Sequence, residues 1–454
     1  MTKVEKNYDR MVNTNVYKLI LLLGIPTTIS MLITNIYNLA DTYFVGTLGE
    51  SPQAATSVLF TLQCIIQAIA FMLGQGAGTH LSKALATKDT DNANRYVTSS
   101  FFIGMVLGFL LMIFGLIFLE PFVKLLGSTN SALKYSKDYG LWILIAAPFM
   151  IGSLILNNTI RFEGKAFYAM FGISIGCLLN IFGDYIFINH MDLGIFGAGM
   201  STAISQIISF VILLVMQQKF CTSKLQFKSI SKKFITYFEI CRAGFPSLIR
   251  QGVTAISNGI LNTLSKPYGD SAQAAMGIVS RYVNFMLCVG IGIGQGFQPF
   301  VAFNYQAKKY KRVIKGMIFT LLFSIGVVSF LAFFGLIIPS QLIKLFQDEK
   351  ETVRIGVYAL KIASIGAIFV PICIVTNMAY QSIRKSEIAS FLALLRSGLI
   401  FIPLVYILKH YINLKGIQIA MPISNIMAGL LSIPFLLWFI IKTPKVDFID
   451  DLNN

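Results

Sequence analysis

A succession of long apolar windows is the feature that most constrains this chain. A helix that crosses the hydrocarbon core of a membrane needs about 20 mostly apolar residues, and roughly a dozen such windows follow one another between short charged connectors. With 55% hydrophobic and only 13% charged residues, the chain does not match a water-soluble domain of 454 residues. The sequence therefore predicts an all-α integral membrane protein with twelve transmembrane helices. The predicted spans begin near Lys18, Pro52, Val97, Asp138, Tyr168, Leu193, Glu239, Gln273, Ile314, Tyr358, Ile388 and Gly416.

The amino-terminal segment does not have the pattern of a cleavable signal peptide. Residues 1–10 are polar, and the apolar run Leu19–Ala40 is too long for a signal core and lacks a small-residue cleavage motif. We therefore expect the first helix to be retained.

Basic residues are distributed unevenly among the connectors. The formal net charge of +17 suggests nucleic acid at first sight, but that interaction requires a folded basic face. With the amino terminus placed in the cytoplasm, about 24 basic residues, Lys445 among them, fall on inside connectors and about 9 on outside ones, in agreement with the positive-inside rule. The charge therefore predicts a topology with both termini cytoplasmic and no nucleic-acid partner.

The chain repeats itself at one constant offset, the spacing that places Gly24 on Gly244, and such repeats are usual in transporters. Each copy holds six predicted helices, so both copies enter the membrane from the same side. We predict two pseudo-symmetric six-helix bundles with a central cavity: residues 1–216, a cytoplasmic basic linker at 217–238, and residues 239–454. Duplication also builds channels and scaffolds, so the repeat favours a carrier without excluding these. Further matching positions include Pro26 with Pro246, Asn38 with Asn258, Gly74–Gly76 with Gly294–Gly296, Asn157 with Asn377, and Lys165 with Lys385.

Two acidic residues, Asp41 and Asp184, fall inside predicted spans, where an ionised side chain needs a partner or a function. Tyr37 and Asn38 lie within one helical turn of Asp41. Asn180 is four residues before Asp184 and so shares its face. Such carboxylate and amide oxygens suit a hard cation, and equally a proton. The alternative is that Asp41 only caps the end of its helix or pairs with a distant arginine.

Ala198 and Thr202 repeat the four-residue spacing in the sixth predicted span, which adds hydroxyl and carbonyl oxygens to the candidate cation site. Pro26 interrupts the first span and removes a backbone hydrogen bond, so it is either a hinge or a structural kink.

Three intramembrane arginines, Arg250, Arg281 and Arg396, lie in the second copy. They can bind anions, line the cavity or extend to a membrane interface, and we favour the interface.

Motifs for bond chemistry are absent from the sequence. There is no HExxH, GxSxG or Walker loop, only three histidines, and six scattered cysteines without a CxxC pair. The sequence therefore predicts neither an enzyme nor a bound cofactor, and it contains no nucleotide domain for direct ATP drive.

The repeat, the Gly-x-Pro opening, the run Asn38–Gly46 and the Asn-x-x-x-Asp of the fifth span together resemble the multidrug and toxic compound extrusion (MATE) family. The resemblance extends from Lys18 to Lys442 and is closest to the DinF-like or MepA-like prokaryotic branch. It implies that the first bundle binds the coupling Na⁺ or H⁺ and that the bend at Pro26 couples ion to cargo. The implied cation-binding residues are Asp41, Asn180, Asp184, Thr202 and the Ala198 carbonyl, and the implied lining of the substrate cavity includes Tyr37, Tyr139 and Asn157, with Asn38 beside them.

One departure concerns the second copy. NorM-like members of the family place acidic cation ligands there, whereas this chain offers Asn258 and Asn377, so coupling through the second copy is not expected.

The sequence and the resemblance lead to one hypothesis and one alternative. The hypothesis is a secondary active multidrug antiporter that exports lipophilic cations in exchange for Na⁺ or H⁺. The alternative is a flippase for lipid-linked saccharides or another amphiphile, although such proteins usually have fourteen spans and cationic cavities. We expect a monomer in the cell membrane of a bacterium or archaeon, in contact with membrane lipids and small-molecule cargo.

Overall fold

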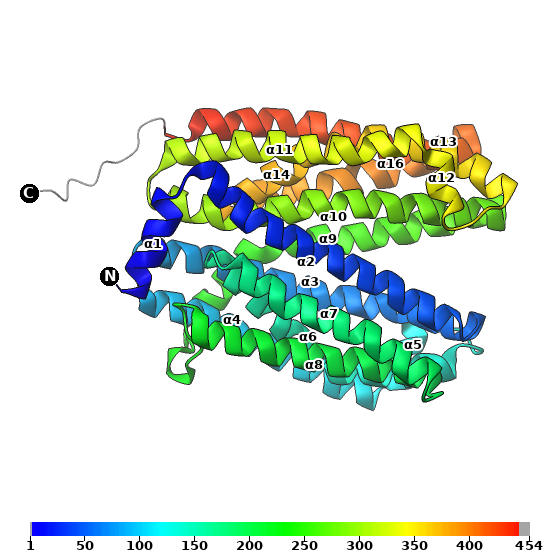
Figure 1. Cartoon of the computed structure of the whole chain (residues 1–454), viewed down its shortest axis with the longest axis horizontal. Helices are drawn as coiled ribbons and strands as arrows, with labels where there is room; N and C mark the ends of the chain where they lie inside the picture. The colour runs from blue at the N-terminus through cyan, green and yellow to red at the C-terminus, as the bar shows by residue number, and fades with distance from the viewer. Residues whose placement is uncertain (1, 445–454) are drawn as a thin grey trace, which may run out of the picture. The chain divides into compact units, whose positions relative to one another are not determined.

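The structure, a computed structural model, describes residues 2–444, and all the regular secondary structure in that range is helical (Figure 1). Met1 and residues 445–454, including the Lys445 of the predicted cytoplasmic tail, lie outside the described residues. The all-helical fold predicted from the sequence is confirmed. The helices are α1 (Lys3–Asn13), α2 (Val16–Gly46), α3 (Glu50–Ala86), α4 (Thr90–Ile117), α5 (Leu119–Leu125), α6 (Leu133–Phe162), α7 (Ala166–Asn189), α8 (Gly194–Phe220), η1 (Phe227–Ser229), α9 (Phe234–Ser265), η2 (Lys266–Tyr268), α10 (Asp270–Gln306), α11 (Tyr310–Ile337), α12 (Pro339–Lys344), α13 (Lys350–Ala367), α14 (Val370–Ser382), α15 (Ser386–Leu394), η3 (Leu395–Ile400) and α16 (Phe401–Lys442).

Membrane-spanning capacity is widespread along the described residues. By length and composition, 9 of their helices can cross a membrane, or up to 10 if the bent pair α13 and α14 forms one span. One of the nine is the 57-residue stretch Ser386–Lys442, whose backbone leaves the helical conformation at Ile412 and Asn413. Helix α9, which carries Glu239 and Arg250, is not among the nine. With α9 added and the long stretch divided at its break, the helices are consistent with twelve spans.

The internal repeat is visible in the helix bounds. Helices α3 and α10 each contain 37 residues, and α4 and α11 each contain 28. The members of each pair begin at positions that the repeat offset relates, Glu50 with Asp270 and Thr90 with Tyr310. The turns repeat as well, because Lys88 and Lys308 both take a positive φ, 58° and 56°. The chain thus folds its two halves in the same way.

Two compact units divide the chain inside helices α2 and α9. The first unit consists of the residues up to Met11 and Ile29–Leu248, and the second of Val12–Thr28 and the residues from Ile249 onward. The break in α2 falls shortly after Pro26, and the break in α9 falls at the same place relative to Pro246. The opening half of α2 therefore belongs with the second copy of the repeat, and the opening half of α9 belongs with the first.

Glycines explain how these exchanged halves pack. In the first unit, a Cβ added to Gly76 of α3 would lie 2.0 Å from the Ile240 carbonyl oxygen of α9. In the second unit, a Cβ added to Gly296 of α10 would lie 2.4 Å from the Cα of Gly24 on α2. Small residues let membrane helices approach this closely. Because Gly76 and Gly296 are equivalent positions of the repeat, the exchange is reciprocal.

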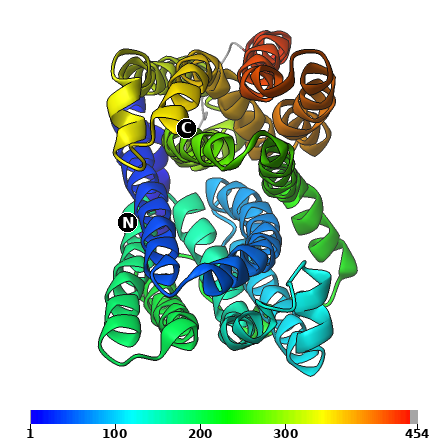
Figure 2. The same cartoon turned by 90° about the vertical axis from the view of Figure 1, so that its right-hand side faces the viewer.

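Each unit has its own apolar core. In the first unit, α6 packs against α3, α4 and α8, and α7 packs against α8. In the second, α10 packs against α11, α13 and α14, and α16 packs against α13 and α14. Figure 2 shows the helices of each unit nearly end-on. The central cavity predicted between the two bundles stays a prediction.

Candidate functional site

The two predicted intramembrane acids come together in the first unit. Asp41 lies on the second half of α2 and Asp184 on α7, and their carboxyl groups are close enough to share a hydrogen bond. The Tyr139 hydroxyl on α6 donates to Asp41 Oδ2 across 3.4 Å. Asp184 is fully buried. Helices α2, α6 and α7 thus supply one acidic cluster.

Asn180 stands one helical turn before Asp184 and makes the next layer of the cluster. Its Nδ2 donates to Asp184 Oδ2 at 3.0 Å. Its carbonyl oxygen accepts from the Thr202 backbone N–H at 3.2 Å and from Thr202 Oγ1 at 3.1 Å, both on α8. The amide therefore holds the Asp184 carboxyl group and joins α7 to α8.

The cluster fits a small hard cation or a proton. The Oδ1 atoms of Asp41 and Asp184 are both buried without a hydrogen-bond partner, so each has a lone pair available in a site that also holds hydroxyl and amide oxygens. Among the described residues, no group of three or more His, Cys, Asp or Glu side chains gathers to hold a metal ion. Ala198 is fully buried on α8, one turn before Thr202, and its carbonyl as a ligand stays a prediction.

Further residues surround the cluster, and some were not predicted. Tyr37 is buried on α2, one turn before Asp41, and its role in lining a substrate cavity stays a prediction. Thr34 Oγ1 of α2 lies 3.8 Å from Cys177 Sγ of α7, and Ser201 Oγ donates to the Asn180 backbone carbonyl at 3.0 Å. Ser201 could have been predicted from the sequence, because it adjoins Thr202 in a run of small residues.

Asn38 and Asn157 are placed differently from the acids. Asn38 is partly buried on α2, and its backbone carbonyl accepts from Thr42 Oγ1 at 2.8 Å. Asn157 Nδ2 donates to the Ala169 carbonyl at 3.0 Å and so joins α6 to α7. Pro26 lies inside α2, in the half of the helix that precedes Asp41. The roles of these residues in a substrate cavity or a hinge stay predictions.

The three arginines of the second copy have different surroundings. Arg281 is exposed, whereas Arg250 and Arg396 are buried. Arg250 Nη1 donates to Asn377 Oδ1 at 3.1 Å. The expectation that all three extend to an interface is therefore consistent only with Arg281.

A duplicated bundle of apolar helices with a buried pair of carboxyl groups is the construction of a multi-pass membrane transporter. The family model described as MatE matches residues 26–186 and 246–407, one match in each copy of the repeat. The chain belongs to the MatE family, as the sequence resemblance indicated.

Related sequences and structures span nearly the whole chain. The multidrug export protein MepA of Staphylococcus saprophyticus is 26% identical over 423 residues, which cover 92% of each chain. MepA of Staphylococcus aureus strain MSSA476 is 26% identical over 420 residues, 91% of this chain and 92% of the relative. The crystal structure of MATE in complex with MaL6 superposes with a TM-score of 0.90 at 22% identity, covering 97% of this chain and 99% of the other. An outward-facing multidrug resistance MATE family transporter of the MOP superfamily gives 0.90 at 21%, covering 97% and 98%. At these identities, the structural matches establish the fold.

Proposed function

We propose that this protein is a secondary active multidrug exporter that exchanges lipophilic cations for Na⁺ or H⁺ across the cell membrane. The paired carboxyl groups of Asp41 and Asp184 carry the proposal, because a buried negative charge attracts whichever cation reaches it. The names of the staphylococcal relatives, both multidrug export proteins, support export of several compounds rather than one.

Exchange follows because the cationic cargo and the coupling ion compete for the same negative charge. A cationic amphiphile enters from the cytoplasmic side and is held by the carboxylates and by aromatic faces such as Tyr37 and Tyr139. Na⁺ or H⁺ entering from outside then occupies Asp41 and Asp184 and removes the attraction for the cargo. Neither guest binds well while the other is present, so the two cross the membrane in opposite directions.

Asn180 positions the Asp184 carboxyl group for its ion. Its amide nitrogen donates to Asp184, and its carbonyl oxygen accepts from Thr202 on the neighbouring helix. Thr202 and the Ala198 carbonyl complete the ion site from α8.

The remaining parts of the proposal follow the sequence expectations. Asn38 and Asn157 contribute to the cargo site in the first unit, and a bend at Pro26 transmits ion binding along α2. Both termini face the cytoplasm, and the transporter acts as a monomer.

The test is ethidium transport in energised inverted membrane vesicles, with the Na⁺ gradient and the proton gradient collapsed separately. We expect transport to stop when the coupling gradient is removed. Asp184→Asn should abolish the dependence on that gradient while the protein remains inserted. Glu120→Gln, which neutralises an exposed carboxylate on α5, is the matched control and should transport normally. Gradient-driven transport by Asp184→Asn at the unaltered rate would refute the proposal.

A further inference from the structure

A pocket in the second unit has the opposite polarity to the acidic cluster of the first. It is lined by 14 residues, six of them polar. Arg396 is the only charged residue in that lining, and none of the fourteen is acidic. The lining consists of Thr254, Asn258, Leu261, Met276, Val279, Ser280, Val283, Asn284, Leu287, Ala363, Arg396, Gln418, Met421 and Pro422.

Arg396 has an unsatisfied hydrogen-bond donor in this pocket. Its side chain is 7% exposed, and its Nη1 has no hydrogen-bond partner. Within the described part of the chain, it forms no ion pair. A buried guanidinium is costly in a membrane unless an anion or an acceptor meets it, so a partner from outside the chain is implied.

The backbone at Arg396 is joined to two neighbouring helices. Arg396 lies in η3, the one π-helical segment among the described residues, and such segments are frequent at functional sites. The Arg396 carbonyl accepts from Ser424 Oγ of α16, and the Ser397 carbonyl accepts from Ser257 Oγ of α9 at 2.6 Å. These two bonds join the π-helical segment to α16 and to α9.

Arg250 adds a second positive charge close to the first. It is 8% exposed and is held by the Asn377 amide, and its charge and that of Arg396 act on each other. The Thr254 hydroxyl, which donates to the Arg250 carbonyl at 2.7 Å, connects this arginine to the pocket lining. The local field is therefore positive.

The internal repeat shows that this polarity is specific to the second copy. When the two copies are aligned by the repeat offset, the acids Asp41 and Asp184 are replaced by Leu261 and Leu404. Conversely, Arg396 takes the place of a glycine, Gly176. The same fold thus offers acidic oxygens in one unit and guanidinium donors in the other.

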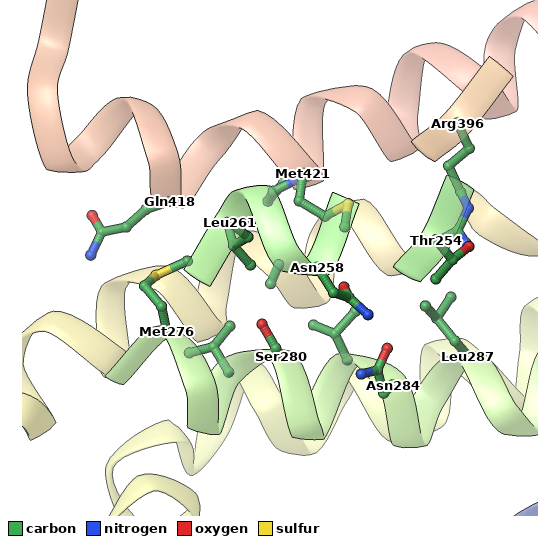
Figure 3. A pocket seen from close by; sticks show the side chains of 14 residues that line it. Thr254, Asn258, Leu261, Met276, Ser280, Asn284, Leu287, Arg396, Gln418 and Met421 are labelled. Atoms are coloured by element: carbon green, nitrogen blue, oxygen red, sulfur yellow. The ribbon is translucent and has the colours of Figure 1, made fainter. Parts of the chain in front are cut away.

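The two ends of the pocket differ in character. Figure 3 shows the Arg396 guanidinium on the Thr254 side, with Met276 at the opposite end and Asn258 and Asn284 between them. Guanidinium and carboxamide nitrogens donate to an oxyanion, and Met276 and Met421 adapt to an apolar group of variable shape.

We propose that this pocket binds an oxyanion, a phosphate ester or a carboxylate, with Arg396 as its anchor and the apolar side chains of the lining, Met276 and Met421 among them, accepting an attached apolar tail. The site goes beyond the proposed export of cations, and it stands whether or not that export is coupled through Asp41 and Asp184.

Calorimetric titration of the purified protein in a neutral maltoside detergent tests the site directly. The probes are hexyl phosphate, inorganic phosphate and hexyltrimethylammonium. We expect hexyl phosphate to bind, and Arg396→Gln to weaken that binding by at least about tenfold, the loss expected for a hydrogen bond to a charged group. Binding of inorganic phosphate with the same dependence on Arg396 assigns the site to free anions. Binding of hexyl phosphate alone assigns it to amphiphiles.

Matched variants separate loss of the site from loss of the fold. Arg281→Gln removes an exposed arginine from α10 and should bind hexyl phosphate as the unaltered protein does. Thr254→Asp places a carboxylate in the pocket and should abolish binding, whereas Thr254→Asn, which adds a side chain of the same shape as aspartate without its charge, should retain it. The proposal is overturned if no phosphate probe binds in a manner that depends on Arg396, or if hexyltrimethylammonium binds with the same dependence. Because these are binding measurements, they are independent of the vesicle assay with Asp184→Asn.

Discussion

The contact between α9 and α3 predicts a large effect of one added methyl group. A Cβ placed on Gly244 lies 1.7 Å from the Met72 carbonyl oxygen and 2.6 Å from its carbonyl carbon. Carbon and oxygen atoms that are not bonded approach to about 3.3 Å at the closest. Because the obstacle is backbone rather than a flexible side chain, Gly244→Ala has to push the two helices apart by more than about 1 Å to restore that separation.

The expected cost follows from overpacking. Extra methylene groups in a packed interior cost about 1–3 kcal/mol, and a backbone obstacle places this variant at the upper end, about 3 kcal/mol. Alanine recovers up to about 1 kcal/mol through its better helix propensity. The net destabilisation of Gly244→Ala should therefore be about 2 kcal/mol.

Gly252→Ala is the matched control on the same helix. A Cβ at Gly252 has no atom within 4 Å, so only the helix-propensity gain remains. The assay is the fraction of purified protein that stays monodisperse in neutral detergent after heating, measured by size-exclusion chromatography. We expect Gly244→Ala to aggregate at a lower temperature than the unaltered protein, and Gly252→Ala to match or exceed it. Equal thermal stability of Gly244→Ala and Gly252→Ala would be incompatible with the close approach of α9 and α3.

Three further predictions concern hydrogen bonds. The Asn92 backbone N–H donates to Asp89 and keeps the pKa of Asp89 below its ordinary value. This helix cap therefore stabilises the protein fully at pH values above the pKa that Asp89 has in the unfolded chain. The stabilisation is lost as the pH falls through the lower pKa that Asp89 has in the folded protein. Asp89→Ala should cost about 1 kcal/mol at neutral pH and less in acid, measured by melting at several pH values, and a pH-independent cost would contradict this. Asn157→Ala should destabilise by about 1 kcal/mol because it removes an interhelical hydrogen bond, and Asn377→Ala should destabilise by more because it also removes the acceptor of the buried Arg250; unchanged melting temperatures would speak against this. Glu163→Gln should speed tryptic cleavage after Lys224, because the buried carboxylate binds the backbone amides of residues 222 and 223, and an unchanged rate would show that the linker is held otherwise.

Much of the helical architecture could be predicted from the sequence. Apolar windows of membrane-spanning length are a direct consequence of the bilayer as solvent, and the constant repeat offset established the equivalence of the two copies. The i, i+4 spacing of Asn180 and Asp184 also predicted a shared face, because helical periodicity is local. The approach of Asp41 from another helix was inferred from the cost of burying a lone charge.

The exchange of helix halves could not be predicted in the same way. Residues on both sides of Pro26 belong to one long helix, so hydropathy does not mark where α2 passes from one unit to the other. The glycines at 76 and 296 were visible as repeat matches, but their partners, Ile240 and Gly24, depend on tertiary packing. The break at Ile412 and Asn413 differs in this respect, because it falls just before Gly416, where the sequence predicts that a new span begins.

Comparison of the two copies separates residues that support the fold from residues that bind guests. Asn157 donates to the Ala169 carbonyl, and Asn377 donates to the Ala389 carbonyl at the equivalent place in the second copy. The close-packing glycines at 76 and 296 are kept in the same way, because both copies have to solve the same helix-packing problem. Charges follow the opposite rule: Asp41 has a leucine as its counterpart, and Arg396 has a glycine. A charge buried in a membrane costs free energy, and each copy folds without the charge of the other. We therefore expect each buried charge to lie where a bound ligand of opposite charge compensates its cost. By this reasoning, Asn157 has a structural role in addition to any contact with cargo, and the acidic cluster and the Arg396 pocket bind guests of opposite charge.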